Sequence, residues 1–477
     1  MLQNKGTIKI EELKNGFTPK WFELNKLNRI LEEFKLKTSL STLSKVKSQG
    51  YTVLGTLTIL LSMPFWGILN INGLFENNEI EEKKDVFYRT KKNPNINWRS
   101  ALWAFAKQFL SVVDKNSCSD ESAYKCLIFD DSLLEKRGCT IERVSRVWDH
   151  VYQKYLLGFK INLMAYWDGK SLLPLDFVLH RERGKNKEKP FGLTKKESKN
   201  QYKKARNADS CGQQRVKETD KTKIETAISM FHRAVKQKVV VDYVLMDSWF
   251  TCTEFIKAVV SVPKKTIHLI GMYKNVNKRF GFRNSEYTIK QIRNMLGNAK
   301  RNRKSGYYYL ETVVVLDDIK LKIYFSRKGK HGKWRTFLCT DLSLSFDKML
   351  EIYSIRWTIE VFFKESKQLF ALGKEQSTDF DSQIAATTIS CMQYLIAAAM
   401  YRFEHYESIG GAFKAAKTEI FRSTLSQRIW EMLIELANII STIFEGADEL
   451  AVLEHLMKSD ETNILLQTML SNFKSAA

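Results

Sequence analysis

The chain has 477 residues, of which 44% are hydrophobic, so it is long and apolar enough for two to four domains and at least one large core. Lysine and arginine total 76 against 53 aspartate and glutamate, and the resulting net charge of +23 favours a polyanionic partner, with nucleic acid preferred to an anionic membrane surface. The seven cysteines lie too far apart to form a zinc-type pair, which excludes a zinc-finger protein.

The N-terminal segment, residues 1–100, is predicted to be mostly helical and to end at a polar break around Pro94. Within it, Val53–Leu69 is uncharged and apolar. This stretch is at the short limit for a membrane span and contains Pro64, so we expect a buried helical hairpin and no membrane contact. The first residues lack a secretory pattern, which favours the cytoplasm.

Beyond residue 120 the hydrophobic pattern becomes that of strands. Lys125–Phe129 is predicted to be a short buried strand that ends at Asp130 and Asp131. Phe159–Trp167 and Leu172–Leu179 are predicted to pair as a hairpin across a turn.

Residues 181–224 form a basic insertion with fifteen lysines and arginines against six acidic residues. Few aliphatic residues occur there, so we expect a long exposed segment. Two interpretations remain open: a solvated charged loop, and a loop that faces DNA.

Strands and helices alternate through the next part of the chain. We expect a helix at Lys221–Lys238, a buried strand at Val239–Met246 that ends at Asp247, a helix at Cys252–Val260, a strand at Thr266–Met272, a strand-rich basic insertion over 274–335, a strand over 336–342, and helices from Lys348 onward. This order predicts a mixed α/β sheet with helices on its faces and the candidate site at the strand ends.

The segment Tyr353–Lys367 carries the sharpest local pattern. On a helix at 100° per residue, Tyr353, Arg356, Glu360 and Lys367 lie within a stripe of roughly 60°. Taken alone, the stripe is typical of an amphipathic helix with an ion pair between Arg356 and Glu360. Its position after two strands that end in aspartate favours a functional site.

Three carboxylates from separate elements are therefore candidate metal ligands: Asp130 or Asp131, Asp247 and Glu360. Their hard oxygen atoms suit Mg²⁺ or Mn²⁺. Two such ions, roughly 3.5–4 Å apart, would stabilise the attacking and leaving oxygens of a phosphodiester. The other three residues of the stripe are candidates for binding DNA phosphates.

The spacing Tyr353-x2-Arg356-x3-Glu360-x6-Lys367 resembles the YREK signature of DDE-type insertion-sequence transposases. In that family an aspartate followed closely by an aromatic residue ends the second catalytic strand, and Asp247 stands in such a sequence, MDSWF. The first catalytic strand of the family ends in an aspartate two residues before a threonine or serine.

That pattern favours Asp130, because Ser132 follows two residues later, although Asp131 remains an alternative ligand. The two side chains must face opposite sides of a strand.

The resemblance implies an RNase H-like catalytic domain over residues 120–400, with the two insertions inside it. It implies cut-and-paste DNA transposition through a hairpin intermediate. The DNA partners would be the double-stranded inverted-repeat ends of the element and the target DNA, and a homodimer would form the synaptic complex. The expected location is the nucleoid in the bacterial cytoplasm. Residues 1–100 are then expected to bind the ends. Residues 401–477, with an amphipathic helix from Gln427, are expected to be helical, and either to pair protomers or to pack onto the catalytic domain. The alternatives are an element-derived DNA-binding protein without catalysis, and a non-transposing nuclease of the same fold.

Several aromatic residues have two possible roles. In relatives, a tryptophan of the strand-rich insertion receives a flipped base, and Trp334 lies nearest to the expected place; an ordinary aromatic at a strand edge is the alternative. Trp249 and Trp357 are expected in the core or behind the site. The sequence Trp148-Asp149-His150 is interpreted as a packing or helix-initiating segment, and support of the active-site loop is the alternative.

Overall fold

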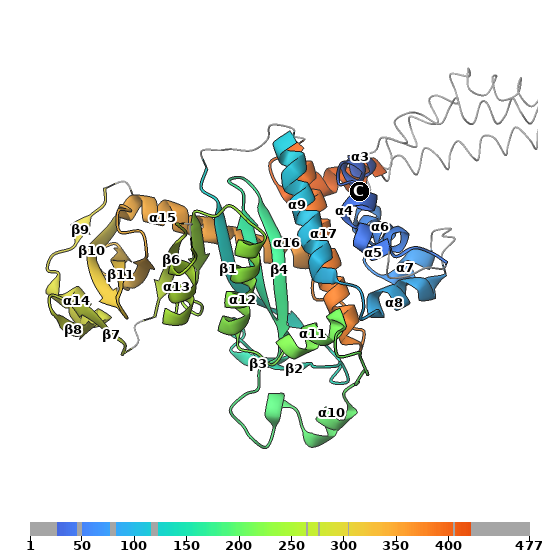
Figure 1. The fold of residues 1–477 in the computed structure, drawn as a ribbon, viewed down its shortest axis with the longest axis horizontal. Coiled ribbons are helices and arrows are strands. Elements are labelled where there is room, and N and C mark those ends of the chain that lie inside the picture. Colours follow the sequence, from blue (N-terminus) through green and yellow to red (C-terminus); the bar gives the residue numbers. More distant parts are fainter. Residues whose placement is uncertain are drawn as a thin grey trace, which may run out of the picture.

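The computed structural model of the chain describes residues 26–420 except 45–49, 77–82, 116–122, 264–265, 275–276, 304 and 404–405. The amphipathic helix predicted from Gln427 lies outside these residues. Figure 1 shows a long central sheet, with a layer of N-terminal helices at one end and strands of the second insertion at the other.

The described part of the N-terminal segment is helical, as predicted. Its elements are α3 (Lys26–Glu33), α4 (Leu36–Ser39), α5 (Ser41–Ser44), α6 (Val53–Ser62), the 3₁₀ helix η1 (Met63–Trp66), α7 (Ile71–Glu76), α8 (Lys84–Lys92) and α9 (Trp98–Lys115).

The apolar stretch in this segment is buried, but the predicted helical hairpin is wrong. It forms a single helix, α6, and the short turn η1. The hydroxyl of Thr52 accepts a hydrogen bond from the backbone of Gly55 and begins α6. Pro64 stands in the 3₁₀ turn, and Gly67 with φ 80° ends it, so the chain leaves before a second helix can pair with the first.

Twelve strands form one mixed sheet. They are β1 (Cys126–Glu135), β2 (Ser145–Asp149), β3 (Lys154–Trp167), β4 (Leu172–His180), β5 (Tyr243–Met246), β6 (His268–Tyr273), β7 (Arg279–Phe282), β8 (Ser285–Thr288), β9 (Lys300–Arg301), β10 (Tyr307–Leu316), β11 (Ile319–Lys328) and β12 (Arg335–Cys339). The strand order is β2-β3-β1-β5-β6-β12-β11-β10-β7-β8, while β4 pairs with β3 and β9 pairs with β10. Among these strands of the described residues, the pairs β1–β5 and β5–β6 are parallel and the other pairs are antiparallel.

Further helices cover this sheet or connect its strands. They are η2 (Pro190–Gly192), α10 (Lys195–Asn200), α11 (Cys211–Glu218), α12 (Lys223–Lys236), α13 (Thr253–Val260), α14 (Ile289–Met295), α15 (Phe346–Ser354), η3 (Ile355–Trp357), α16 (Thr358–Leu369) and α17 (Phe380–Phe403). The expected mixed α/β fold of the RNase H-like type, with a strand-rich insertion between the second aspartate and the glutamate, is confirmed.

The first strand is longer than predicted, so the expectation that it ends at Asp130 is wrong. The pairing of β1 with the short β5 stops at Phe129, opposite Met246. The pairing with β3 continues to Glu135, opposite Gly158. The long hairpin partner β3 therefore keeps the chain extended through Asp130 and Asp131 after the parallel neighbour has ended.

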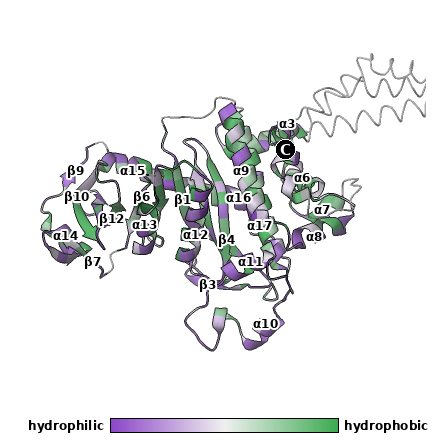
Figure 2. Ribbon diagram, viewed as in Figure 1, coloured by the Kyte–Doolittle hydropathy of each residue, from purple (hydrophilic) through white to green (hydrophobic). Residues whose placement is uncertain are grey.

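Helix α17 is the centre of the hydrophobic core on one side of the sheet. It packs against α3, α6, α8, α9 and strand β4 (Figure 1). It is long and apolar enough to cross a membrane, but 89% of its most apolar window is buried inside the protein, as expected of a core helix. Figure 2 shows the contrast between hydrophobic colours on the central strands and the hydrophilic surface helix α10.

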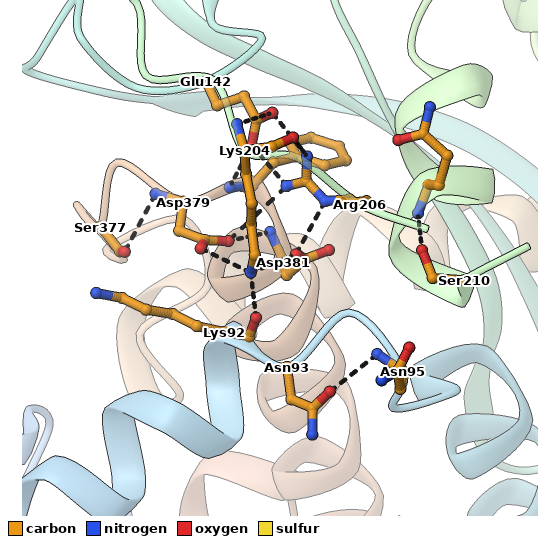
Figure 3. Close-up of polar contacts among 12 residues, drawn as sticks. Lys92, Asn93, Asn95, Glu142, Lys204, Arg206, Ser210, Ser377, Asp379 and Asp381 are labelled. Carbon is orange, nitrogen blue, oxygen red and sulfur yellow. Dashed lines mark hydrogen bonds and ion pairs between the residues drawn. The ribbon is translucent and has the colours of Figure 1, made fainter. Parts of the chain in front are cut away.

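The basic insertion 181–224 is not an exposed loop throughout, and this part of the prediction is wrong. The side chain of Arg206 is 1% exposed and forms a two-pronged ion pair with Glu142, at 2.7 and 2.6 Å. Arg206 also contacts Asp381, and Lys204 contacts Asp379 and Asp381, each at 2.9–3.0 Å (Figure 3). Acidic partners from distant segments therefore neutralise Lys204 and Arg206 and bury the Arg206 side chain, which the local sequence does not reveal.

Candidate active site

The two predicted aspartates lie at one edge of the sheet. Phe129 of β1 and Met246 of β5 are register partners in the parallel pair, and Asp130 and Asp247 follow them directly. The residues of both strands up to this point are mostly apolar and are buried. The chain therefore first becomes polar where the parallel pairing ends. Helix α16 packs against β1 and carries Glu360 in its first turn.

A single guanidinium joins two of the predicted carboxylates. Arg356 Nη1 lies 2.9 Å from Asp130 Oδ2, and Arg356 Nη2 lies 2.5 Å from Glu360 Oε1. Arg356 and Asp130 are 226 positions apart in the chain, so only the tertiary fold brings this pair together. The side chains of Arg356 and Asp130 are each 16% exposed, whereas Glu360 is 35% exposed. The site is therefore open to solvent on the side of the glutamate.

Negative charge at this edge is only partly compensated. Burial raises the pKa of Asp130 to about 7; Arg356 opposes this shift, while the carboxylate of Asp247 adds to it. Burial also raises the pKa of Asp247, and backbone hydrogen bonds from Trp249 and Phe250 to its carboxylate oppose that change. The ionised carboxylates of Asp130 and Asp247 repel each other, and a cation bound between them would remove this repulsion. The pair is therefore suited to binding a cation.

The side chain of Asp131 has different partners. Its carboxylate contacts Lys223 of α12 and lies 3.7 Å from Lys160 of β3. The alternation of side chains along β1 explains the separation, because consecutive residues of a strand face opposite sides. The structure thus brings Asp130 together with Arg356 and Glu360, and gives Asp131 two lysine neighbours.

The predicted single helix through Tyr353–Lys367 is wrong. Helix α15 ends at Ser354, the 3₁₀ turn η3 follows, and α16 starts at Thr358. Tyr353 consequently points into the protein: its hydroxyl donates to the Met246 carbonyl at 3.3 Å, and its ring packs edge-on against Phe337. Burial raises the pKa of Tyr353 to about 12. These contacts fix the end of β5, next to Asp247.

Lys367 of α16 contacts β1 at Ser132, the residue that follows Asp131. Its ammonium donates to the hydroxyl of Ser132 at 2.7 Å, and burial lowers its pKa. Because its hydrogen-bond acceptor is neutral, the ammonium keeps a charge that can pair with a phosphate.

The side chains at this edge of the sheet decide whether a metal ion can bind there. Within the part of the chain that the structure describes, no three carboxylate, imidazole or thiolate side chains are grouped closely enough to hold one. Arg356 instead supplies the positive charge between Asp130 and Glu360. The hard oxygen donors and the raised pKa values of Asp130 and Asp247 nevertheless suit a divalent cation such as Mg²⁺.

The three tryptophans singled out by the sequence have different surroundings. Trp334 precedes β12 and is half-buried, with the guanidinium of Arg327 4.5 Å from its ring centroid. Trp249 and Trp357, expected in the core or behind the site, are 54% and 62% exposed, so a core position is wrong for both, although the backbone N–H of Trp249 supports Asp247 from behind. The position of both tryptophans in the chain could have indicated their exposure. Each lies in a turn after a strand or helix ends, and such turns project side chains outward.

The raised pKa of Asp130 gives a pH-dependent stability prediction. The ordinary value of 3.8 describes the unfolded chain, and the folded value is about 7. The folded chain therefore loses stability as the pH rises from 4 to 7, and the total loss by pH 8 is on the order of 3–4 kcal/mol. We expect Asp130→Asn to be more stable than the wild type at pH 8 without divalent ions, and the gap to shrink at pH 5.

Thermal unfolding of both proteins in chelator at the two pH values measures this effect. Asp209→Asn, which changes a carboxylate on the surface, is the matched control and should follow the wild type at both pH values. A constant difference between Asp130→Asn and wild type at pH 5 and pH 8 would contradict the burial argument.

Two family models match the chain. That of the DDE superfamily endonucleases matches residues 87–276, and that of an archaeal putative transposase, ISC1217, matches residues 202–401. The matches overlap and together span 87–401, which includes Asp130, Asp247 and Glu360. No curated protein matches the chain.

Proposed function

Because the chain belongs to the DDE-type insertion-sequence transposases, we propose that Asp130, Asp247 and Glu360 are its catalytic carboxylates. The family implies an enzyme that binds DNA and has nuclease or transposase activity. The observation that carries the assignment is the bridge from Arg356 to both Asp130 and Glu360, beside Asp247 at the ends of two parallel strands. Asp130 is preferred to Asp131 because the carboxylate of Asp131 contacts two lysines.

DDE superfamily endonucleases generally use divalent metal ions, and we propose Mg²⁺ or Mn²⁺, as two ions, on the three carboxylates. Bound there, the ions would lower the pKa of the attacking water or 3′-hydroxyl and stabilise the departing oxygen. Arg356 then no longer has to neutralise Asp130 and Glu360, and its guanidinium can bind a DNA phosphate. Lys367, from the next turns of α16, is positioned to hold a second phosphate. Tyr353 acts indirectly, through its hydrogen bond to the end of β5.

Cut-and-paste transposition is the proposed reaction. A water would nick each element end, the freed 3′-hydroxyl would attack the opposite strand to form a hairpin, and the reopened end would join target DNA. Residues 1–100 are proposed to bind the inverted-repeat ends, and residues 401–477 to pair two protomers in the synaptic complex. Trp334 is proposed to stack on a flipped base. The guanidinium groups of Arg327 and Arg293 already lie against its ring, so the base would have to share or displace these contacts. The cytoplasm and nucleoid of a bacterium are the proposed location.

The test uses purified full-length chain, Mg²⁺ and labelled DNA from the regions that flank its gene. Nicks followed by hairpins at the element boundary support the proposal. Nicking without any strand joining would support a non-transposing nuclease instead. Binding without cleavage would support an element-derived DNA-binding protein.

Metal binding can be measured without any DNA. At a concentration about 100 times its dissociation constant, Mg²⁺ or Mn²⁺ should stabilise the wild-type fold by ~2.7 kcal/mol. Asp130→Asn and Asp247→Asn should lose most of this stabilisation, and Asp131→Asn should retain it. Thermal unfolding with and without the ion is the measurement. If Asp131→Asn loses the stabilisation and Asp130→Asn keeps it, the assignment of the first ligand is reversed.

A further inference from the structure

Four aromatic rings form a continuous row beside the carboxylates. The row consists of Tyr155, Trp148, His150 and Trp249. Neighbouring ring centroids are 4.9 Å apart for Tyr155 and Trp148, 6.4 Å for Trp148 and His150, and 6.1 Å for His150 and Trp249. The first three belong to the hairpin of β2 and β3, and the last follows Asp247 by two residues. The row therefore leads from the hairpin to the turn that carries a proposed catalytic carboxylate.

This aromatic row is accessible to solvent. Tyr155 is 57% and Trp249 54% exposed, which is unusual for large rings that could have been buried. The hairpin turn is fixed by Asp149, whose carboxylate accepts hydrogen bonds from the backbone of Val151 and Tyr152 at 2.7 and 2.9 Å. Trp148, Asp149 and His150 thus form the end of β2 and its turn and do not begin a helix, while the partly buried Trp148 packs against Tyr155.

Lysine ammonium groups lie close to rings of the row and of the adjoining turn. The ammonium of Lys274 lies 3.4 Å from the ring centroid of Trp249, and that of Lys223 lies 5.2 Å from it. Lys154 lies 5.4 Å from the ring of Tyr152 in the turn. Lys223 also contacts Asp131, so it connects the row to the strand of the aspartates. Exposed rings with ammonium groups beside them can bind bases and phosphates together.

A pocket of about 410 Å³ lies between the hairpin turn and the end of α16. Its cationic lining consists of Lys160, Lys367 and Lys374, and its acidic lining of Asp131, Glu135 and Asp149. Two of these carboxylates are already engaged, Asp131 by lysines and Asp149 by the backbone of the turn. The ammonium of Lys367, held by the neutral Ser132, remains suited to an anion.

We propose that the aromatic row, with its lysines and the adjoining pocket, binds unpaired nucleotides of a DNA strand that leads to the carboxylate site. The direction of that strand rests on the proposed function. Single-stranded DNA fits this surface because unpaired bases offer free faces to stack on exposed rings, whereas the bases of a duplex already stack on each other. The lysines would hold the phosphates between the stacked bases.

Binding of two labelled probes to the full-length chain tests the proposal: a single-stranded oligothymidine and a duplex of the same length. We expect Trp249→Ala and Tyr155→Ala each to weaken single-strand binding about tenfold, and to change duplex binding by less than about twofold. Trp249→Phe keeps a stacking face and should restore most of the single-strand affinity. Val240→Ala, which shortens an exposed apolar side chain before β5, is the control and should change neither affinity.

Two results would overturn the inference: unchanged single-strand binding in the alanine variants, or equal weakening on both probes. If Trp249→Ala does not fold, Tyr155→Ala on the exposed hairpin decides alone. A wild type that does not cleave but binds single strands through the row would contradict only the proposed function. A wild type that cleaves normally, with single-strand binding insensitive to Trp249 and Tyr155, would contradict only this inference.

Discussion

Replacement of Glu360 by glutamine is expected to abolish DNA cleavage while DNA binding persists. The change removes one charged oxygen donor from the proposed metal site and keeps the size of the side chain. Bound metal ions stabilise transition-state charge by several kcal/mol. A loss of ~4 kcal/mol corresponds to a rate reduced about a thousandfold. The side chain is 35% exposed, so the fold should survive the substitution.

Cleavage rate and DNA affinity should be measured on the same preparation. Glu351→Gln changes an exposed glutamate of α15, paired with Lys348, and is the matched control that should cleave at the wild-type rate. Cleavage by Glu360→Gln at the wild-type rate would remove Glu360 from the metal site. Loss of binding together with cleavage would instead point to a role in holding the DNA, through the orientation of Arg356.

Substitution of Arg206 by methionine is expected to destabilise the protein by about 3–5 kcal/mol. The guanidinium is almost fully buried, and it contacts Glu142 and Asp381 directly. Its removal leaves these carboxylates buried without their main positive partner, and Lys204 alone cannot neutralise them together with Asp379. Figure 3 shows how the cluster joins three separate segments of the chain.

Denaturant unfolding measures this loss. Lys187→Met, an exposed change in the same basic insertion, is the control and should shift stability by less than about 0.5 kcal/mol. Arg206→Lys should be intermediate, because lysine keeps the charge but not the two-pronged contact with Glu142. Equal stability of Arg206→Met and the wild type would mean that water or a rearranged Lys204 takes over the neutralisation.

Patterns that depend on neighbouring residues could be predicted well from the sequence. The insertion predicted to be strand-rich over 274–335 contains β7 to β11, and β3 and β4 pair as the two apolar runs across a turn predict. Boundaries that depend on distant partners were predicted less well. The extension of β1 past Asp130 requires the long β3, and the break of the predicted helix at Ile355–Trp357 lies where the chain passes the end of β5.

The sequence by itself determined the mixed α/β order, the basic character of the chain and the candidates Asp130 or Asp131, Asp247 and Glu360, because hydrophobic periodicity and residue spacing are local properties. Only the tertiary structure decided that Arg356 joins Asp130 to Glu360, that Asp131 turns toward Lys223, and that Trp249 is exposed. It also decided that Arg206 of the basic insertion is buried in ion pairs. The physical reason is common to all four: burial and charge pairing depend on residues from other elements, such as Asp130, which is 226 positions from Arg356, and a local sequence pattern does not show which of these residues will be in contact.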